Sequence, residues 1–106
     1  EKGSLQYKVE EFTDEAVVKI SGWALNRKTL RAGTLNIVLT GQDKQQYIVK
    51  SERLYRPDVR DAFGKRRLAF AGFEAAFIKQ NLPKQHYEVS LVLDGDARMV
   101  GSIVVA

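Results

Sequence analysis

Apolar and polar residues alternate along most of the chain with a period of two, which is typical of half-buried β-strands. The clearest case covers residues 87–93, in which every second side chain is apolar. The same alternation marks six further segments, at residues 5–9, 17–25, 35–39, 47–50, 73–77 and 98–105. Turn residues separate these segments at spacings of about 8–12 residues. The pattern therefore predicts an all-β fold of about seven strands.

One corner of the chain refines this prediction. Asn81-Leu82-Pro83-Lys84 precedes Tyr87, which begins the strand with the cleanest alternation. In immunoglobulin-like sandwiches a tyrosine at such a corner donates its hydroxyl to the backbone a few residues upstream; the alternative is a plain core tyrosine. We expect an immunoglobulin-like antiparallel β-sandwich. Its predicted core consists of Val18, Ile20, Leu35, Ile37, Phe73, Phe77, Tyr87, Val89 and Leu91.

Residues 73–83 permit two interpretations. Phe73, Phe77 and Gln80 have helical spacing, and two alanines lie between them. The same segment also alternates as a strand does. We predict a strand, because the strand that follows needs an antiparallel neighbour.

The stretch RLYRPDVRDAFGKRR, residues 53–67, predicts a short helical crossover. Pro57 restricts its own φ and keeps the preceding residue extended. Asp58 can cap a turn that Gly64 ends. Arg56 is expected to brace the crossover through a bidentate contact, and Val59 to anchor it. Arg56, Pro57, Asp58 and Val59 are therefore interpreted as structural.

The charges suggest a second role for the same stretch. The 106 residues contain 17 Lys and Arg against 13 Asp and Glu, a net charge of +4. This mild excess favours polyanions but also fits an ordinary basic surface. Lys65, Arg66 and Arg67 follow the helix-ending glycine and are expected to face solvent, together with Arg60. Trp23 could add a stacking surface for a sugar or a base, or could instead pack against the crossover or a partner domain.

The residues that catalysis needs are scarce. The chain has no cysteine and one histidine, His86. Asp58 and Asp61 stand among arginines, which keep carboxylates ionised, whereas a general acid needs a raised pKa. Asp94 and Asp96 flank a glycine, as turn residues do. We therefore expect no catalytic, metal or cofactor site in this domain.

The length of 106 residues fits one domain, residues 1–106. No apolar run approaches the roughly 18 residues of a membrane-spanning helix. The chain begins at Glu1, and we expect it to be a module from a longer protein.

Four short motifs occur in a characteristic order: ISGWALN (residues 20–26), YRPDV (55–59), GF (72–73) and HYEVSLVL (86–93). With them, residues 17–105 resemble the β-sandwich accessory domains of bacterial glycosyltransferases that make teichoic acids or surface polysaccharides. The resemblance implies a non-catalytic interaction module in bacteria, cytoplasmic or membrane-peripheral. Its partner would be a transferase domain of the same parent chain or another protein. The GKRR segment (64–67) is not part of that pattern.

A free-standing polyanion-binding module is the alternative, with a phosphate-rich glycan or nucleic acid as ligand. An oligonucleotide- and oligosaccharide-binding barrel would be its expected fold, but that barrel has five strands. About seven are predicted here, so nucleic acid is the less favoured partner and an anionic glycan remains possible.

Overall fold

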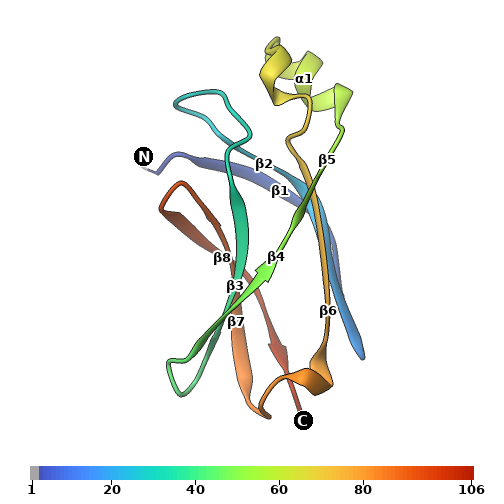
Figure 1. Ribbon diagram of the computed structural model, residues 1–106, viewed down its shortest axis with the longest axis vertical. Helices are drawn as coiled ribbons and strands as arrows, with labels where there is room; N and C mark the ends of the chain where they lie inside the picture. The colour runs from blue at the N-terminus through green and yellow to red at the C-terminus, as the bar shows by residue number, and fades with distance from the viewer. Residues whose placement is uncertain (1–2) are drawn as a thin grey trace.

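The computed structural model describes residues 3–106, which form two four-stranded antiparallel sheets packed face to face (Figure 1). The first sheet has the order β1-β2-β6-β5 and the second β4-β3-β7-β8. The strands are β1 (Leu5–Asp14), β2 (Val17–Asn26), β3 (Leu35–Gly41), β4 (Gln46–Lys50), β5 (Glu52–Leu54), β6 (Gly72–Ile78), β7 (His86–Leu93) and β8 (Asp96–Val104). Apart from β4, this order is the A-B-E-D and C-F-G order of constant-type immunoglobulin domains. The predicted fold is confirmed.

The described residues contain eight strands, because the chain changes sheets after β4. β4 pairs with β3 in the second sheet, whereas β5 pairs with β6 in the first. Only Ser51 separates the two strands, and its hydroxyl donates to the Leu35 carbonyl at 2.8 Å. The alternation did not reveal β5, because three residues are too few to show a period of two.

The core lies between the sheets. Eight of the nine predicted core residues are buried there, at 5% exposure or less. Phe77 is the exception: it is only partly buried, although it packs against the core. It stands one residue from the end of β6, where the short 3-10 helix η2 (Lys79–Asn81) begins and the sandwich ends. The strand prediction for this segment is confirmed over Gly72–Ile78.

The tyrosine corner is also confirmed. The Tyr87 hydroxyl donates to the Pro83 carbonyl at 2.6 Å, and the side chain is 1% exposed. Its ring meets Tyr47 edge to face, with 6.0 Å between centroids. The corner therefore joins the start of β7 to the loop before it.

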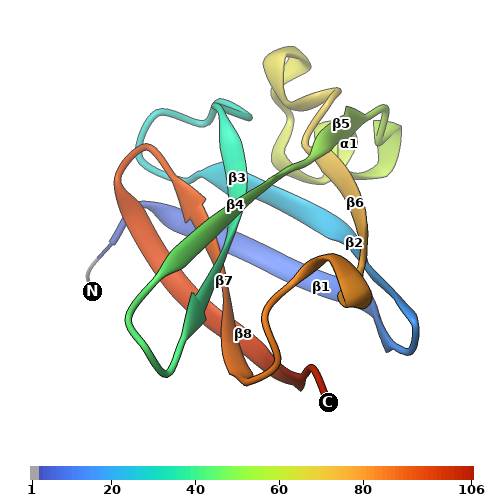
Figure 2. The same cartoon turned by 60° about the horizontal axis from the view of Figure 1, so that its bottom comes forward.

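The crossover between β5 and β6 consists of helix α1 (Pro57–Phe63) and the 3-10 helix η1 (Arg66–Leu68). Figures 1 and 2 both place it at one end of the sandwich, away from the C-terminus. As predicted, Gly64 ends α1, with a left-handed φ of 64°. This end of the molecule holds most of the candidate site residues.

Candidate functional site

A second apolar cluster attaches the crossover to the first sheet. It comprises Leu25, Val59, Leu68 and Ala71, each at most 4% exposed. The anchoring role expected of Val59 is thus confirmed. Trp23 packs on this cluster with its ring edge to face with Phe63, at a centroid distance of 6.1 Å. Its position supports the packing interpretation rather than an open stacking surface.

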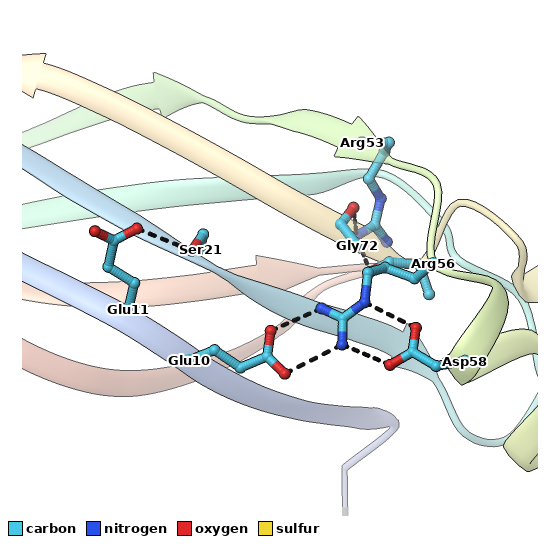
Figure 3. A network of polar contacts seen from close by, with 8 residues as sticks. Glu10, Glu11, Ser21, Arg53, Arg56, Asp58 and Gly72 are labelled. Carbon is cyan, nitrogen blue, oxygen red and sulfur yellow. Dashed lines mark hydrogen bonds and ion pairs between the residues drawn. The ribbon is translucent and has the colours of Figure 1, made fainter.

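Arg56 occupies the centre of a charged network on the outer face of the first sheet (Figure 3). Its Nε and Nη2 donate to the two Asp58 carboxylate oxygens at 2.9 and 2.8 Å. Nη1 and Nη2 also donate to Glu10 at 2.7 and 3.1 Å. The predicted bidentate contact is therefore present, and Glu10 is a second partner that the sequence did not suggest.

A β-bulge directs Glu10 toward this arginine. Val9 pairs with Gly22 and Glu11 with Ser21, so Glu10 is an extra residue in β1. Bulges commonly redirect one side chain in this way. The strand can therefore point two successive glutamates outward, and one of them reaches Arg56.

Two glycines permit the close approach of neighbouring chains here. A Cβ on Gly72 would lie 2.5 Å from Arg56 Cγ and 2.8 Å from the Leu54 carbonyl oxygen. A Cβ on Gly22 would lie 2.0 Å from the Lys8 carbonyl oxygen, beside the bulge. Both glycines belong to the motifs that carry the family resemblance.

Electrostatics keep the network ionised. The hydrogen bonds from Arg56 hold the pKa of Asp58 at about 2. They also lower the pKa of Glu10, while Asp58 and Glu10 together raise the pKa of Arg56. Carboxylates with lowered pKa values are suited to structural ion pairs and not to proton donation at neutral pH.

One detail of the crossover differs from the prediction. The N-cap of α1 is Arg56, which makes no side-chain cap hydrogen bond, and Asp58 lies inside the first turn. Asp58 was expected to cap the turn, and that expectation is wrong. The helix begins at Pro57, two residues before the start that a cap at Asp58 implies, and the Asp58 carboxylate binds the Arg56 guanidinium instead.

Arg53 is a structural residue whose role the sequence did not indicate. Its Nη1 donates to the Ala71 carbonyl and its Nη2 to the Ala24 carbonyl, both at 3.0 Å, and Nη2 also donates to Ala32. Burial lowers its pKa to about 10, so the guanidinium stays charged at neutral pH. It joins β2, the loop before β3 and the end of the crossover. Because an arginine on a three-residue strand carries no local signature, no sequence signal identifies this role.

Tyr55 and Phe70 form an exposed aromatic pair beside this network. They are 55% and 56% exposed, with ring centroids 5.5 Å apart and planes tilted by 52°. The Arg60 guanidinium lies 5.8 Å from the Tyr55 ring centroid and donates to its hydroxyl at 3.1 Å. Arg60 also pairs with Asp61 at 3.0 Å. No pattern in the sequence indicated a role for either ring.

The three basic residues after Gly64 do not behave alike. All are exposed, as expected, but Arg67 donates to the Leu30 and Thr29 carbonyls, each at 2.9 Å. It therefore braces the loop between β2 and β3. Lys65 and Arg66 line a shallow depression with Arg60. Within residues 3–106, neither of these two side chains has a hydrogen-bond or ion-pair partner.

The remaining polar candidates lie elsewhere or have structural partners. His86 is exposed at the start of β7, in a hollow that Thr40 and Ser102 also line. Asp94 accepts a hydrogen bond from Asn26 Nδ2, and Asp96 accepts one from the Leu5 backbone N–H, both at 2.9 Å. The bond to Leu5 lowers the pKa of Asp96.

In the part of the chain that the structure describes, no three His, Asp or Glu side chains are arranged to hold a metal ion. No helix within residues 3–106 is long and apolar enough to cross a membrane. Comparison of the chain with models of protein families, with curated proteins and with solved structures finds no significant match.

Proposed function

We propose that this domain is a non-catalytic accessory module of a bacterial glycosyltransferase that synthesises a cell-surface polymer, teichoic acid or polysaccharide. The module positions the transferase domain or its polymer through a surface at the helical crossover. One observation carries the proposal. Three of the four motifs that resemble such modules (20–26, 55–59 and 72–73), though far apart in sequence, meet at a single joint between the crossover and the first sheet, while the fourth forms β7 of the second sheet.

The joint consists of contacts among β2, β6 and the crossover. Gly72 pairs with Trp23, and Phe73 pairs with Gly22. Arg56 lies against Gly72 and reaches Glu10 on the far strand of the sheet. Val59 anchors the helix in the cluster beneath. These motifs therefore build one joint between the crossover and the sheet. Such a joint fixes the surface at this end of the molecule, which suits a module that binds a partner.

The joint holds Tyr55, Arg60 and Phe70 at the exposed end of the molecule. Exposed aromatic rings beside arginine are enriched at recognition surfaces. Apolar side chains fill the space between the sheets. We therefore place the interaction at this surface and not inside the sandwich.

A free-standing polyanion-binding module is the second candidate. Lys65 and Arg66 favour it, since both are exposed next to Arg60 in the same depression. The basic surface is small, however, and a net charge of +4 is low for a protein that follows a nucleic-acid backbone. An anionic glycan with few charges fits this surface better.

The coding sequence on either side of this chain provides the first test, which is expected to reveal a glycosyltransferase domain. The second test removes the module from that parent and compares sugar transfer to a short soluble acceptor and to the polymer. Transfer to the short acceptor should be retained, and transfer to the polymer should fall. A reading frame without a transferase domain, or sugar transfer by the isolated module, would overturn the proposal.

A further inference from the structure

We propose that Tyr55, Phe70 and Arg60 form a binding site for an anionic sugar unit. The two rings receive the apolar face of the sugar, and Arg60 with Lys65 and Arg66 receives its phosphate or carboxylate. The inference rests on the proposed function for the source of the sugar, a cell-surface polymer.

The exposure of the two rings is the first observation. More than half of each side chain is open to water, although the rings lie within 5.5 Å of each other. Adjacent exposed aromatic side chains form an apolar patch, and such patches often mark binding sites. Tyr55 precedes α1 and Phe70 follows η1, so only the folded crossover brings them together.

The rings are also held in place. The Arg56 backbone N–H donates to the Ala69 carbonyl at 2.6 Å, which joins the two ends of the crossover next to the rings. Arg60 bonds to the Tyr55 hydroxyl and lies over its ring. A surface that is ordered before binding loses less conformational entropy when a ligand arrives.

Arg60 can receive an anion without releasing these contacts. Its Nε donates to Asp61 and its Nη1 to Tyr55, while Nη2 makes no hydrogen bond within residues 3–106. A guanidinium has five N–H groups, so donors remain for a phosphate or a carboxylate. Lys65 and Arg66 line the same depression, where with Arg60 they outnumber the one carboxylate in its lining, Asp61.

The geometry favours a sugar over a nucleic-acid base or an acidic peptide. With the ring planes tilted by 52°, the two rings cannot both lie flat on one planar base. A puckered sugar ring can place C–H groups against two inclined faces. An acidic peptide would use the cations but would leave the aromatic pair uncovered.

The test is a titration of the chain with four soluble probes, in which calorimetry and NMR measure binding. The main probe is a tetramer of N-acetylglucosamine units joined by phosphodiesters. Three further probes serve as comparisons. The N-acetylglucosamine tetramer lacks the charge, a glycerol phosphate tetramer lacks the sugar ring, and octathymidylate carries nucleosides in place of the sugar. The sugar phosphate is expected to bind most tightly and to shift the resonances of Tyr55 and Phe70.

Substitutions at the three site residues test which side chains contact the sugar phosphate. Tyr55→Ala and Phe70→Ala should each weaken binding about fivefold or more, which is the lower range for loss of one stacking ring. Arg60→Gln should make the salt dependence of binding shallower, because fewer counterions are released. Ile48→Ala, at a 68% exposed apolar residue on β4, and Lys84→Gln, at an exposed lysine in the loop before β7, are the controls. If an alanine variant melts at lower temperature, Tyr55→Leu and Phe70→Leu keep the apolar volume and remove only the ring.

Failure to bind the sugar phosphate at millimolar concentration would overturn the inference. So would equal losses in the site and control variants, or equally tight binding of octathymidylate through the same residues. A parent with a transferase domain but no sugar-phosphate binding would contradict this inference alone. Binding by a chain whose parent has no transferase domain would contradict the proposed function alone.

Discussion

Arg56 and Glu10 are separated by 46 residues in the chain, and their side chains form two hydrogen bonds of 2.7 and 3.1 Å. The pair connects the crossover to β1 at the opposite edge of the first sheet. Asp58 binds the same guanidinium from the other side (Figure 3). This arginine therefore helps to orient the crossover, and with it the exposed aromatic pair, together with the apolar cluster around Val59.

Replacing this arginine should destabilise the fold. Arg56→Ala is expected to lower the free energy of unfolding by about 1 kcal/mol, because a partly buried side chain loses charge-assisted hydrogen bonds to two carboxylates that are exposed to solvent. The stability of Arg56→Lys should fall between those of the unmodified chain and Arg56→Ala, since an ammonium cannot reproduce both bidentate contacts. Urea titration measures the effect, with the exposed Lys84→Ala as the control. A loss no greater than in that control would contradict the assigned role.

Stability should fall in acid through the same network. The pKa of Asp58 is about 2 in the folded protein against 3.8 for the free side chain, and the pKa of Glu10 is lowered from 4.5. Both carboxyls therefore bind protons less readily when the chain is folded, and their contribution is complete above about pH 5 and is lost as the pH falls toward 2.

This pH dependence can be measured from urea midpoints between pH 7 and pH 2. The Arg56→Leu variant is the matched comparison, because it removes the cation and keeps both carboxyls. Its stability should change less with pH than that of the unmodified chain over this range. Parallel curves would show that the network does not contribute to the acid sensitivity.

The tyrosine corner gives a prediction with an internal control. Tyr87→Phe should lower the free energy of unfolding by about 1 kcal/mol, because it removes the 2.6 Å hydrogen bond between the buried tyrosine and the carbonyl of the exposed Pro83. Tyr47→Phe keeps the ring contact with Tyr87 and removes a hydroxyl that has no hydrogen bond within residues 3–106. Thermal melting should separate the two variants. Equal melting temperatures would exclude a stabilising corner.

The three basic residues after Gly64 should contribute unequally to the stability of the fold. Arg67→Ala is expected to cost about 1 kcal/mol, because two hydrogen bonds to the loop before β3 are lost. Lys65→Ala and Arg66→Ala should each change stability by no more than about 0.5 kcal/mol. Single variants compared by urea titration test the division. Three equal values would contradict the bracing role of Arg67.

Much of the fold could be predicted from local pattern. The alternation around Val18, Leu35 and Val89 placed these residues in the core, because one face of each strand must be buried. Tyr87 and Pro83 were close enough in sequence for the corner to be recognised. Arg56 and Asp58 were also near neighbours, so their contact could be predicted, whereas the exact start of α1 could not.

What the sequence determined by itself is seven of the eight described strands, the buried face of each and the position of the crossover, because these follow from short-range periodicity and turn chemistry. Only the tertiary structure decided that β5 changes sheets, that a bulge turns Glu10 toward Arg56, and that Tyr55 lies beside Phe70. These relationships depend on strand register and on where the crossover closes. Register is set by the packing of whole sheets, so no short segment of the sequence contains it.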